Sequence, residues 1–258
     1  MSSSIHHRPH QGELSMTLAR DVQSPDELQH VIARGVFGDR LAPNAEWGTE
    51  LYNAIAREAH ERQWQVWSLC IMGTHYHLLV STPDNSLSVG LQRAHVSHAI
   101  RRNGKEKERR GAVFGRPFDV FPIRDDRHLR NTLRYIPRNP VAAGLCSDPA
   151  DWAYGTYRAL AGLEACPRWV PKSRIFRSLE GVFSDRHDPW FGEADYREFC
   201  GSEANSPEPP QAIADWNRYD AQCMREDGKS SREIADGLGI TIRHARRLSD
   251  ASGHSKGT

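Results

Sequence analysis

Two strand-like stretches separated by only two residues place the strongest constraint on this fold. The first covers residues 65–72 and the second runs from His75 to Val80, and both are largely apolar. Gly73 and Thr74 alone lie between them, which is the spacing of a tight turn between antiparallel strands. The chain is therefore expected to contain an antiparallel β-hairpin, which excludes a purely parallel sheet.

Helical and strand patterns alternate on both sides of this hairpin. Apolar positions repeat at helical spacing over residues 44–62, 86–102 and 125–139, and short strands are expected over 28–33 and 118–123. Asn44 can cap the first helix, and Asp125 suits the N-terminus of the last one. The interleaving predicts an α+β domain over residues 27–163, with an antiparallel sheet backed by helices.

Three further segments flank this predicted domain. Residues 1–26 are expected to form a flexible lead, and residues 164–210 an extension and linker that ends in a proline-rich stretch. Residues 211–252 are predicted to form a small all-α helix-turn-helix domain, with Gly239 at its turn. Its second helix would expose three arginines to DNA, namely Arg243, Arg246 and Arg247. A short helical hairpin used only for packing is the alternative.

Positive charge is concentrated in one part of a chain whose formal net charge is only +1. The segment from Arg93 to Arg138 holds thirteen Lys or Arg against five Asp or Glu. Such a surplus can attract phosphate groups, although a well-solvated helix surface explains it equally well. Candidate DNA contacts within the segment are Arg101, Arg102 and Arg116.

The cysteines and the hydropathy pattern give an expectation for the cell compartment. The five cysteines lie far apart and form no Cys-x-x-Cys pair, so neither a zinc site nor a disulfide framework is indicated. No stretch approaches the roughly 20 apolar residues of a membrane span. We therefore expect a cytoplasmic protein with reduced thiols and no membrane partner.

Two short patterns carry possible chemistry. On a strand, His75 and His77 point to the same face, so their imidazoles could chelate a divalent metal. Tyr135 and Asn139 lie four residues apart on a predicted helix and share a face. Each pattern by itself also has an ordinary structural explanation, as a buried strand and as the end of a helix.

The order and spacing of these patterns resemble those of a known family. Ile71-Met-Gly-Thr-His-Tyr-His-Leu-Leu-Val80 is followed by a basic helix, by Phe114-Gly-Arg-Pro-Phe118 and by Leu133-Arg-Tyr-Ile-Pro-Arg-Asn-Pro-Val-Ala-Ala-Gly-Leu145. This arrangement, over about residues 28–163, resembles the REP-associated tyrosine transposases. These are single-tyrosine transposases of the HUH nuclease superfamily.

The resemblance implies a fold, a mechanism and a set of site residues. It implies a ferredoxin-like or RRM-like antiparallel sheet with helices on one face. His75 and His77 match the histidines that hold Mg²⁺ or Mn²⁺, Asn139 the third ligand and Tyr135 the nucleophile. The enzyme would cut single-stranded or hairpin DNA through a 5′-phosphotyrosine intermediate and transfer the strand. A monomer is favoured over a homodimer.

Two alternatives to a transposase follow from the same residues. The first is a DNA-binding regulator that keeps the fold and has lost cleavage. The presence of all four residues, His75, His77, Tyr135 and Asn139, favours the enzyme, because a protein that only binds DNA does not need them. The second is an RNA-binding module, which is disfavoured because the strands lack the closely spaced aromatic residues that stack on RNA bases.

Overall fold

The computed structural model describes residues 27–36, 40–106, 109, 111–115, 118–183, 190–201, 230–232, 242–243 and 245–246. Most of the predicted helix-turn-helix segment, including Arg247, lies outside the described residues, and so does Arg116. The described pieces of that segment include helical positions at Arg243 and Arg246, both of which are exposed.

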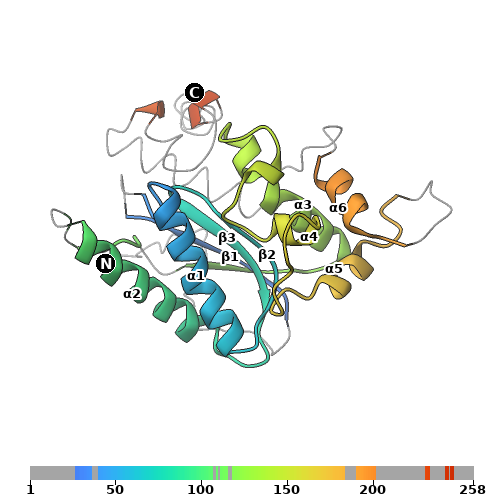
Figure 1. Cartoon of the computed structure of the whole chain (residues 1–258), viewed down its shortest axis with the longest axis horizontal. Helices are drawn as coiled ribbons and strands as arrows, with labels where there is room; N and C mark the ends of the chain where they lie inside the picture. Colours follow the sequence, from blue (N-terminus) through green and yellow to red (C-terminus); the bar gives the residue numbers. More distant parts are fainter. Residues whose placement is uncertain are drawn as a thin grey trace, which may run out of the picture.

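Four antiparallel strands form the sheet at the centre of the fold (Figure 1). They are β1 (Gln29–Arg34), β2 (Gln65–Ile71), β3 (His75–Ser81) and β4 (Asp119–Pro122), in the order β2-β3-β1-β4. Strands β2 and β3 form the predicted hairpin. With helix α1 (Ala45–Glu61) after β1 and helix α2 (Leu87–Lys105) after β3, the chain follows the βαββαβ path of a ferredoxin-like fold. The expected α+β class is confirmed.

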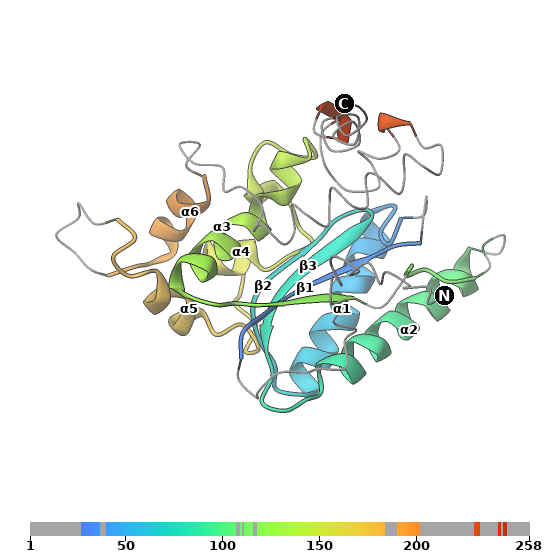
Figure 2. The same cartoon turned by 180° about the vertical axis from the view of Figure 1, so that it is seen from behind.

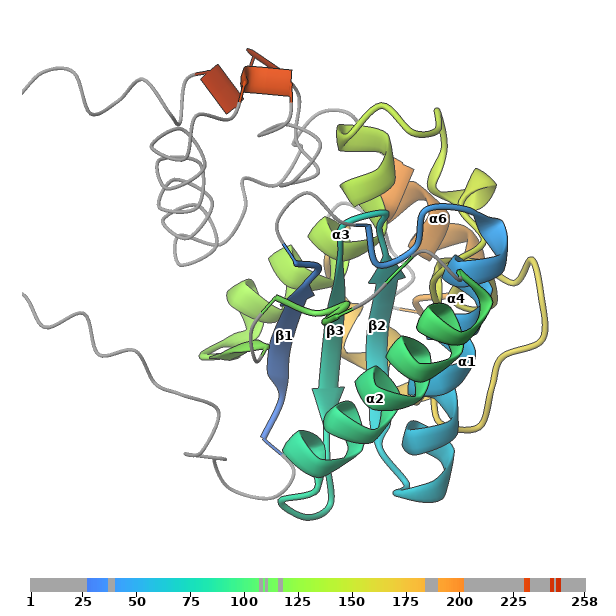
Figure 3. The same cartoon turned by 90° about the vertical axis from the view of Figure 1, so that its left-hand side faces the viewer.

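Helices α1 and α2 pack together on one face of the sheet, as Figure 3 shows. The apolar side of α1 is built from Leu51, Ile55 and Ala59, which repeat at helical spacing and are fully buried. They join Leu78 and Val80 of β3 in one hydrophobic core. Asn44 begins α1 as expected, because its side chain accepts a hydrogen bond of 3.1 Å from the Trp47 amide.

The opposite face of the sheet carries helix α3 (Asp126–Ala142) and the segment that follows it (Figure 2). This segment contains a short 3-10 turn (Pro149–Asp151) and three helices, α4 (Tyr157–Leu160), α5 (Lys172–Leu179) and α6 (Glu193–Gly201). Residues 164–201 were expected to be an extension outside the domain. Instead Ile175, Tyr196 and Phe199 are buried with Leu133 and Ile136 of α3, so the packed unit continues past residue 163.

Helix α3 is longer than the sequence predicts, because it continues through Pro137 and Pro140 to Ala142. Proline has no backbone N–H, so Pro140 leaves the Ile136 carbonyl without its usual helical donor. The Asn139 side chain replaces that donor, since its Nδ2 donates to Ile136 O at 3.2 Å. The same Nδ2 lies 3.0 Å from Tyr135 O. Asn139 thereby supports the helix at the point where proline would weaken it.

Four of the five cysteines lie in the part of the chain that the structure describes. Cys70, Cys146, Cys166 and Cys200 are all free thiols. In the part of the chain that the structure describes, no helix is long and apolar enough to cross a membrane.

Lowering the pH is expected to destabilise the fold through His95 of α2. Its ring stacks on Phe114, and its Nε2 lies 2.8 Å from the Tyr76 hydroxyl. Burial, and to a smaller extent the charge of His98, lowers the pKa of His95 to about 3. Between about pH 6.5 and pH 3 the unfolded chain therefore binds more protons here than the folded chain. Stability is complete above this window and falls as the pH decreases through it.

Urea unfolding at about pH 7 and about pH 5.5 measures this effect. His95→Gln cannot titrate, so this variant should lose about 1 kcal/mol less stability than the parent over that interval. An equal loss in both proteins would show that His95 does not contribute to the acid sensitivity.

Candidate catalytic site

The alternation of side chains along β3 brings the two predicted metal ligands together. His75 and His77 both point toward α3, and their ring centroids lie 5.0 Å apart at nearly a right angle. Tyr76 points to the other face, where its hydroxyl hydrogen bonds to His95. Both histidines are buried, because β3 is covered along its whole length. The two imidazoles therefore lie side by side on one face of the sheet, as His-x-His on a strand predicts.

Helix α3 places the predicted nucleophile against this pair. Leu133 and Ile136 are fully buried and fix α3 on the sheet. Tyr135 lies between them in sequence and is half-buried. Its ring meets the His77 ring edge-on, with 5.5 Å between the centroids. The long-range packing of α3 thus brings together a phenol and an imidazole that are 58 positions apart in the chain.

Asn139 lies one helical turn beyond Tyr135, and its side chain is buried. Its Nδ2 is held by the carbonyls of Tyr135 and Ile136. Both of these hydrogen bonds use the amide nitrogen, so the amide oxygen can still accept from another partner. The side chain also contributes to lowering the pKa of the Tyr135 phenol, against the larger effect of burial. All four predicted site residues therefore lie on the α3 side of the sheet, and Tyr135 is the one that contacts His77.

His30 on β1 is a site residue that the sequence analysis missed. It is opposite Leu79 in the β1–β3 register and so shares the face of His77. Its Nε2 lies 3.1 Å from His77 Nδ1, and both rings are buried. A single histidine within an apolar strand gives no signal of its own, because the β1–β3 register is what brings it next to His77.

Arg34, at the other end of β1, is the second residue that was missed. It is directly opposite His75 in the strand register, so its side chain shares the site face. Its positive charge contributes to lowering the pKa values of His75, His77 and Tyr135. The structure therefore adds the positively charged guanidinium of Arg34 to the two imidazoles, the phenol and the amide of the predicted site.

Burial sets the protonation states in the site. It lowers the pKa of His75 to about 3 and holds that of His77 well below its ordinary value, so both rings are neutral near pH 7. A neutral imidazole keeps the lone pair that a metal requires. Burial also raises the pKa of Tyr135 to about 12, against the opposing effect of Arg34. The phenol is therefore protonated near pH 7 unless additional positive charge approaches it.

The donor atoms suit a divalent cation, although they are not a cluster of acidic or sulfur ligands. No three His, Cys, Asp or Glu side chains of the described residues form a group that could hold a metal ion. The expected set instead combines two imidazoles with the Asn139 amide oxygen. His77 Nε2 is buried and has no hydrogen-bond partner among the described residues. Burying such an atom costs free energy, which a bound cation would offset.

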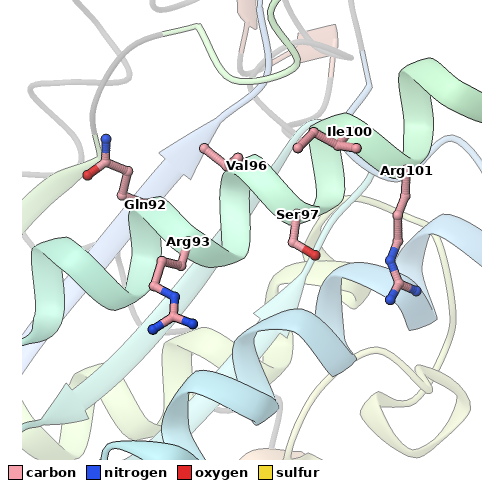
Figure 4. Close-up of a pocket in the computed structure, with 6 residues that line it drawn as sticks. All are labelled: Gln92, Arg93, Val96, Ser97, Ile100 and Arg101. Carbon is pink, nitrogen blue, oxygen red and sulfur yellow. The ribbon is translucent and has the colours of Figure 1, made fainter.

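The predicted DNA-contacting arginines have different environments. Arg102 is 4% exposed, and it bonds to Arg40 O and to Glu106, so it supports the packing of α2. Arg101 is exposed and pairs with Glu50 at 3.0 Å. It lines an open hollow on the outer face of α2 with Arg93, Val96 and Ile100 (Figure 4). That hollow is on the opposite side of the sheet from the histidines.

Known proteins that are similar to this chain include a curated sequence and a solved structure. No family model matches the chain. A curated protein of Haemophilus influenzae, named as a REP-associated tyrosine transposase, is 27% identical over 128 residues. The matched region is 46% of this chain and 73% of that protein. The chain is similar to the REP-associated tyrosine transposases.

This relationship confirms the resemblance that the motifs indicated and the tyrosine-transposase type of enzyme. A solved structure of a REP-associated tyrosine transposase bound to a REP hairpin is also similar to this chain. It shares 16% identity and a TM-score of 0.47, over 59% of this chain and 89% of the other.

Proposed function

We propose that this transposase relative is a metal-dependent endonuclease and strand transferase for single-stranded DNA, with Tyr135 as its nucleophile. The observation on which this proposal depends is the contact between the Tyr135 ring and the His77 ring, with 5.5 Å between their centroids. It brings a nucleophile to a pair of neutral imidazoles inside a buried site. The named relative supports the reaction class.

The reaction that this site supports is a transesterification. The Tyr135 oxygen attacks the phosphorus of a phosphodiester, and the bond from phosphorus to the 3′ oxygen breaks. The phenol proton is lost and the departing 3′ oxygen gains one, so a free 3′-hydroxyl and a 5′-phosphotyrosine link result. A second 3′-hydroxyl can reverse the step on another strand, because the covalent link retains the energy of the original bond.

The side chains around Tyr135 have separate tasks in this proposal. His75, His77 and Asn139 would hold Mg²⁺ or Mn²⁺, which when bound supplies a Lewis acid for the phosphate oxygens. Arg34 lies on the same face and adds positive charge beside the phenol. Because the Tyr135 and His77 rings are in contact, the phosphate would lie beside this pair.

Single-stranded or hairpin DNA is the proposed partner, bound by a monomer. Arg101, Arg243 and Arg246 are exposed arginines that could contact its backbone. The second candidate function, a DNA-binding regulator without cleavage, would use the same arginines. The two differ in one product, because only the enzyme becomes covalently attached to DNA.

The test is an adduct assay with a single-stranded hairpin oligonucleotide and Mn²⁺. A label on the 3′ side of the cut should migrate with the protein in a denaturing gel, and a label on the 5′ side should be released with a free 3′-hydroxyl. Chelation of the metal should prevent both changes. DNA binding without any adduct, over a panel of hairpins, would favour the regulator.

Arg34→Ala is expected to reduce the rate of cleavage about 100-fold, because it removes fixed positive charge from the phenol and the phosphate. Arg34→Lys keeps the charge and should recover part of the rate. A single-turnover cleavage assay measures both variants, with Arg57→Ala as the control, since Arg57 is exposed on α1. If Arg34→Ala cleaves as fast as Arg57→Ala, Arg34 has no role in the chemistry.

A further inference from the structure

His30 is a buried histidine to which the proposed mechanism gives no task. Its side chain is 0% exposed, and it lies on β1, which pairs with β3 on one side and with β4 on the other. Its ring is 5.2 Å from that of His77, 6.3 Å from that of Phe121 and 6.5 Å from that of Tyr135, between centroids. It therefore lies directly behind the candidate site, on a strand that is fixed from both sides.

The 3.1 Å contact between His30 Nε2 and His77 Nδ1 shares one proton between two neutral rings. If His77 Nδ1 carries the proton, it donates to His30 Nε2, and His77 Nε2 keeps its lone pair. If His30 Nε2 carries the proton, it donates to His77, and His77 Nε2 must carry the other proton. Only the first arrangement leaves His77 Nε2 able to bind a cation.

We propose that His30 is a positioning residue, which accepts the Nδ1 proton of His77 and so presents the His77 Nε2 lone pair to the metal. This inference rests on the proposed function, because it assumes a cation beside His77. Nε2 of His77 is one of the buried atoms that lack a hydrogen-bond partner among the described residues, as expected for a nitrogen whose lone pair is free to bind a cation. Partners of this kind orient metal-binding histidines in many proteins.

The packing of the sheet makes this arrangement rigid. The His30 ring cannot turn toward solvent, because Phe121 is directly opposite it in the β1–β4 register and Leu79 in the β1–β3 register. The imidazole of His77 is confined in the same way by His75 and Tyr135. The acceptor on His30 is therefore held in place before any cation arrives, and binding requires no rearrangement of the two rings.

Two variants separate this role from a packing role. His30→Phe fills the space and removes the acceptor, whereas the Gln oxygen in His30→Gln can still accept from His77. Mn²⁺ affinity, followed by the paramagnetic resonance signal of free Mn²⁺, should fall about 10- to 100-fold in His30→Phe. It should stay within about threefold of the parent in His30→Gln. Equal affinities in all three proteins would overturn the proposal.

The tautomer of His77 gives a second readout that needs neither metal nor DNA. Nitrogen-15 NMR of the histidine rings in the metal-free parent should show His77 protonated at Nδ1. His30→Phe should shift the proton toward Nε2, and His30→Gln should restore Nδ1. Protonation of His77 at Nε2 in the parent would overturn the proposal even if neither variant folds.

These readouts remain informative if the proposed function fails. A parent protein that forms no adduct with DNA but binds Mn²⁺ through His77 would contradict the transposase mechanism and leave the role of His30 intact. A parent that forms the adduct while His77 carries its proton on Nε2 would support the transposase mechanism and contradict the role of His30.

Discussion

Replacing Tyr135 with phenylalanine is expected to abolish the covalent protein–DNA adduct and to leave DNA binding unchanged. The phenyl ring can keep the edge contact with His77, so the fold should lose no more than about 1 kcal/mol of stability. The oxygen that attacks phosphorus is gone, however. Strand cleavage should fall by at least about 10,000-fold, as when other covalent nucleophiles are removed.

A gel assay for the adduct and a binding assay with the uncut hairpin together measure this effect. Tyr154→Phe is the matched control, because Tyr154 is half-buried on the segment after α3 and lies outside the candidate site. It should form the adduct at the parental rate. An adduct that persists in Tyr135→Phe would place the nucleophile on another residue and refute the assignment.

Removing the imidazole of His77 is expected to have the second-largest effect. His77 Nε2 is the one nitrogen of the expected ligands that is buried without a hydrogen-bond partner in the described part of the chain, so His77→Ala should weaken Mn²⁺ binding more than any other single change among the expected ligands. Cleavage at a fixed Mn²⁺ concentration should fall at least about 100-fold. Extra metal should restore only part of it, because the remaining ligands cannot replace the lost bond.

His75→Ala should show the same pattern more weakly. His75 Nδ1 lies 3.0 Å from the Thr74 hydroxyl. The His75 ring therefore has a hydrogen-bond partner in the turn between β2 and β3, outside the candidate site. His60→Ala is the control for both variants, because His60 is exposed near the end of α1. Titration of Mn²⁺ in the cleavage assay checks the order of effects. Parental cleavage by His77→Ala would remove the basis for a metal at this site.

Local sequence was sufficient to predict most of the secondary structure between residues 27 and 163, but not the helices α5 and α6 beyond it. The alternation in His75-Tyr76-His77 indicates which side chains share a strand face, and Asn44 and Asp125 mark the helix starts at which they act as caps. These patterns depend on neighbours within one turn or one strand. The end of α3 was misjudged, because the donor that compensates Pro140 is the side chain of Asn139, which no periodicity reveals.

The parts that depend on long-range packing could not be predicted in the same way. His30 and Arg34 reach the site through the register of β1 against β3, and neither has a pattern in its own neighbourhood. The segment after residue 163 was expected to be an extension outside the domain. Its packing against α3 follows only from the burial of Ile175 and Tyr196 with residues of that helix.

The resemblance to a family gave the roles of four residues, and the structure brings those four residues together. His75, His77, Tyr135 and Asn139 come from a strand and a helix that pack face to face. The roles themselves stay predictions until chemistry is measured. The exposed arginines of α2 and of the C-terminal segment remain candidate DNA contacts.

The most direct measurement is to identify the amino acid that carries DNA after cleavage. The adduct formed with a single-stranded hairpin and Mn²⁺ can be digested with protease and nuclease, and the linked peptide sequenced by mass spectrometry. The expected result is a nucleotide joined through its 5′ phosphate to Tyr135. A nucleotide on any other residue, or a cleaved strand with no attached peptide, would contradict the assignment of Tyr135 as the nucleophile.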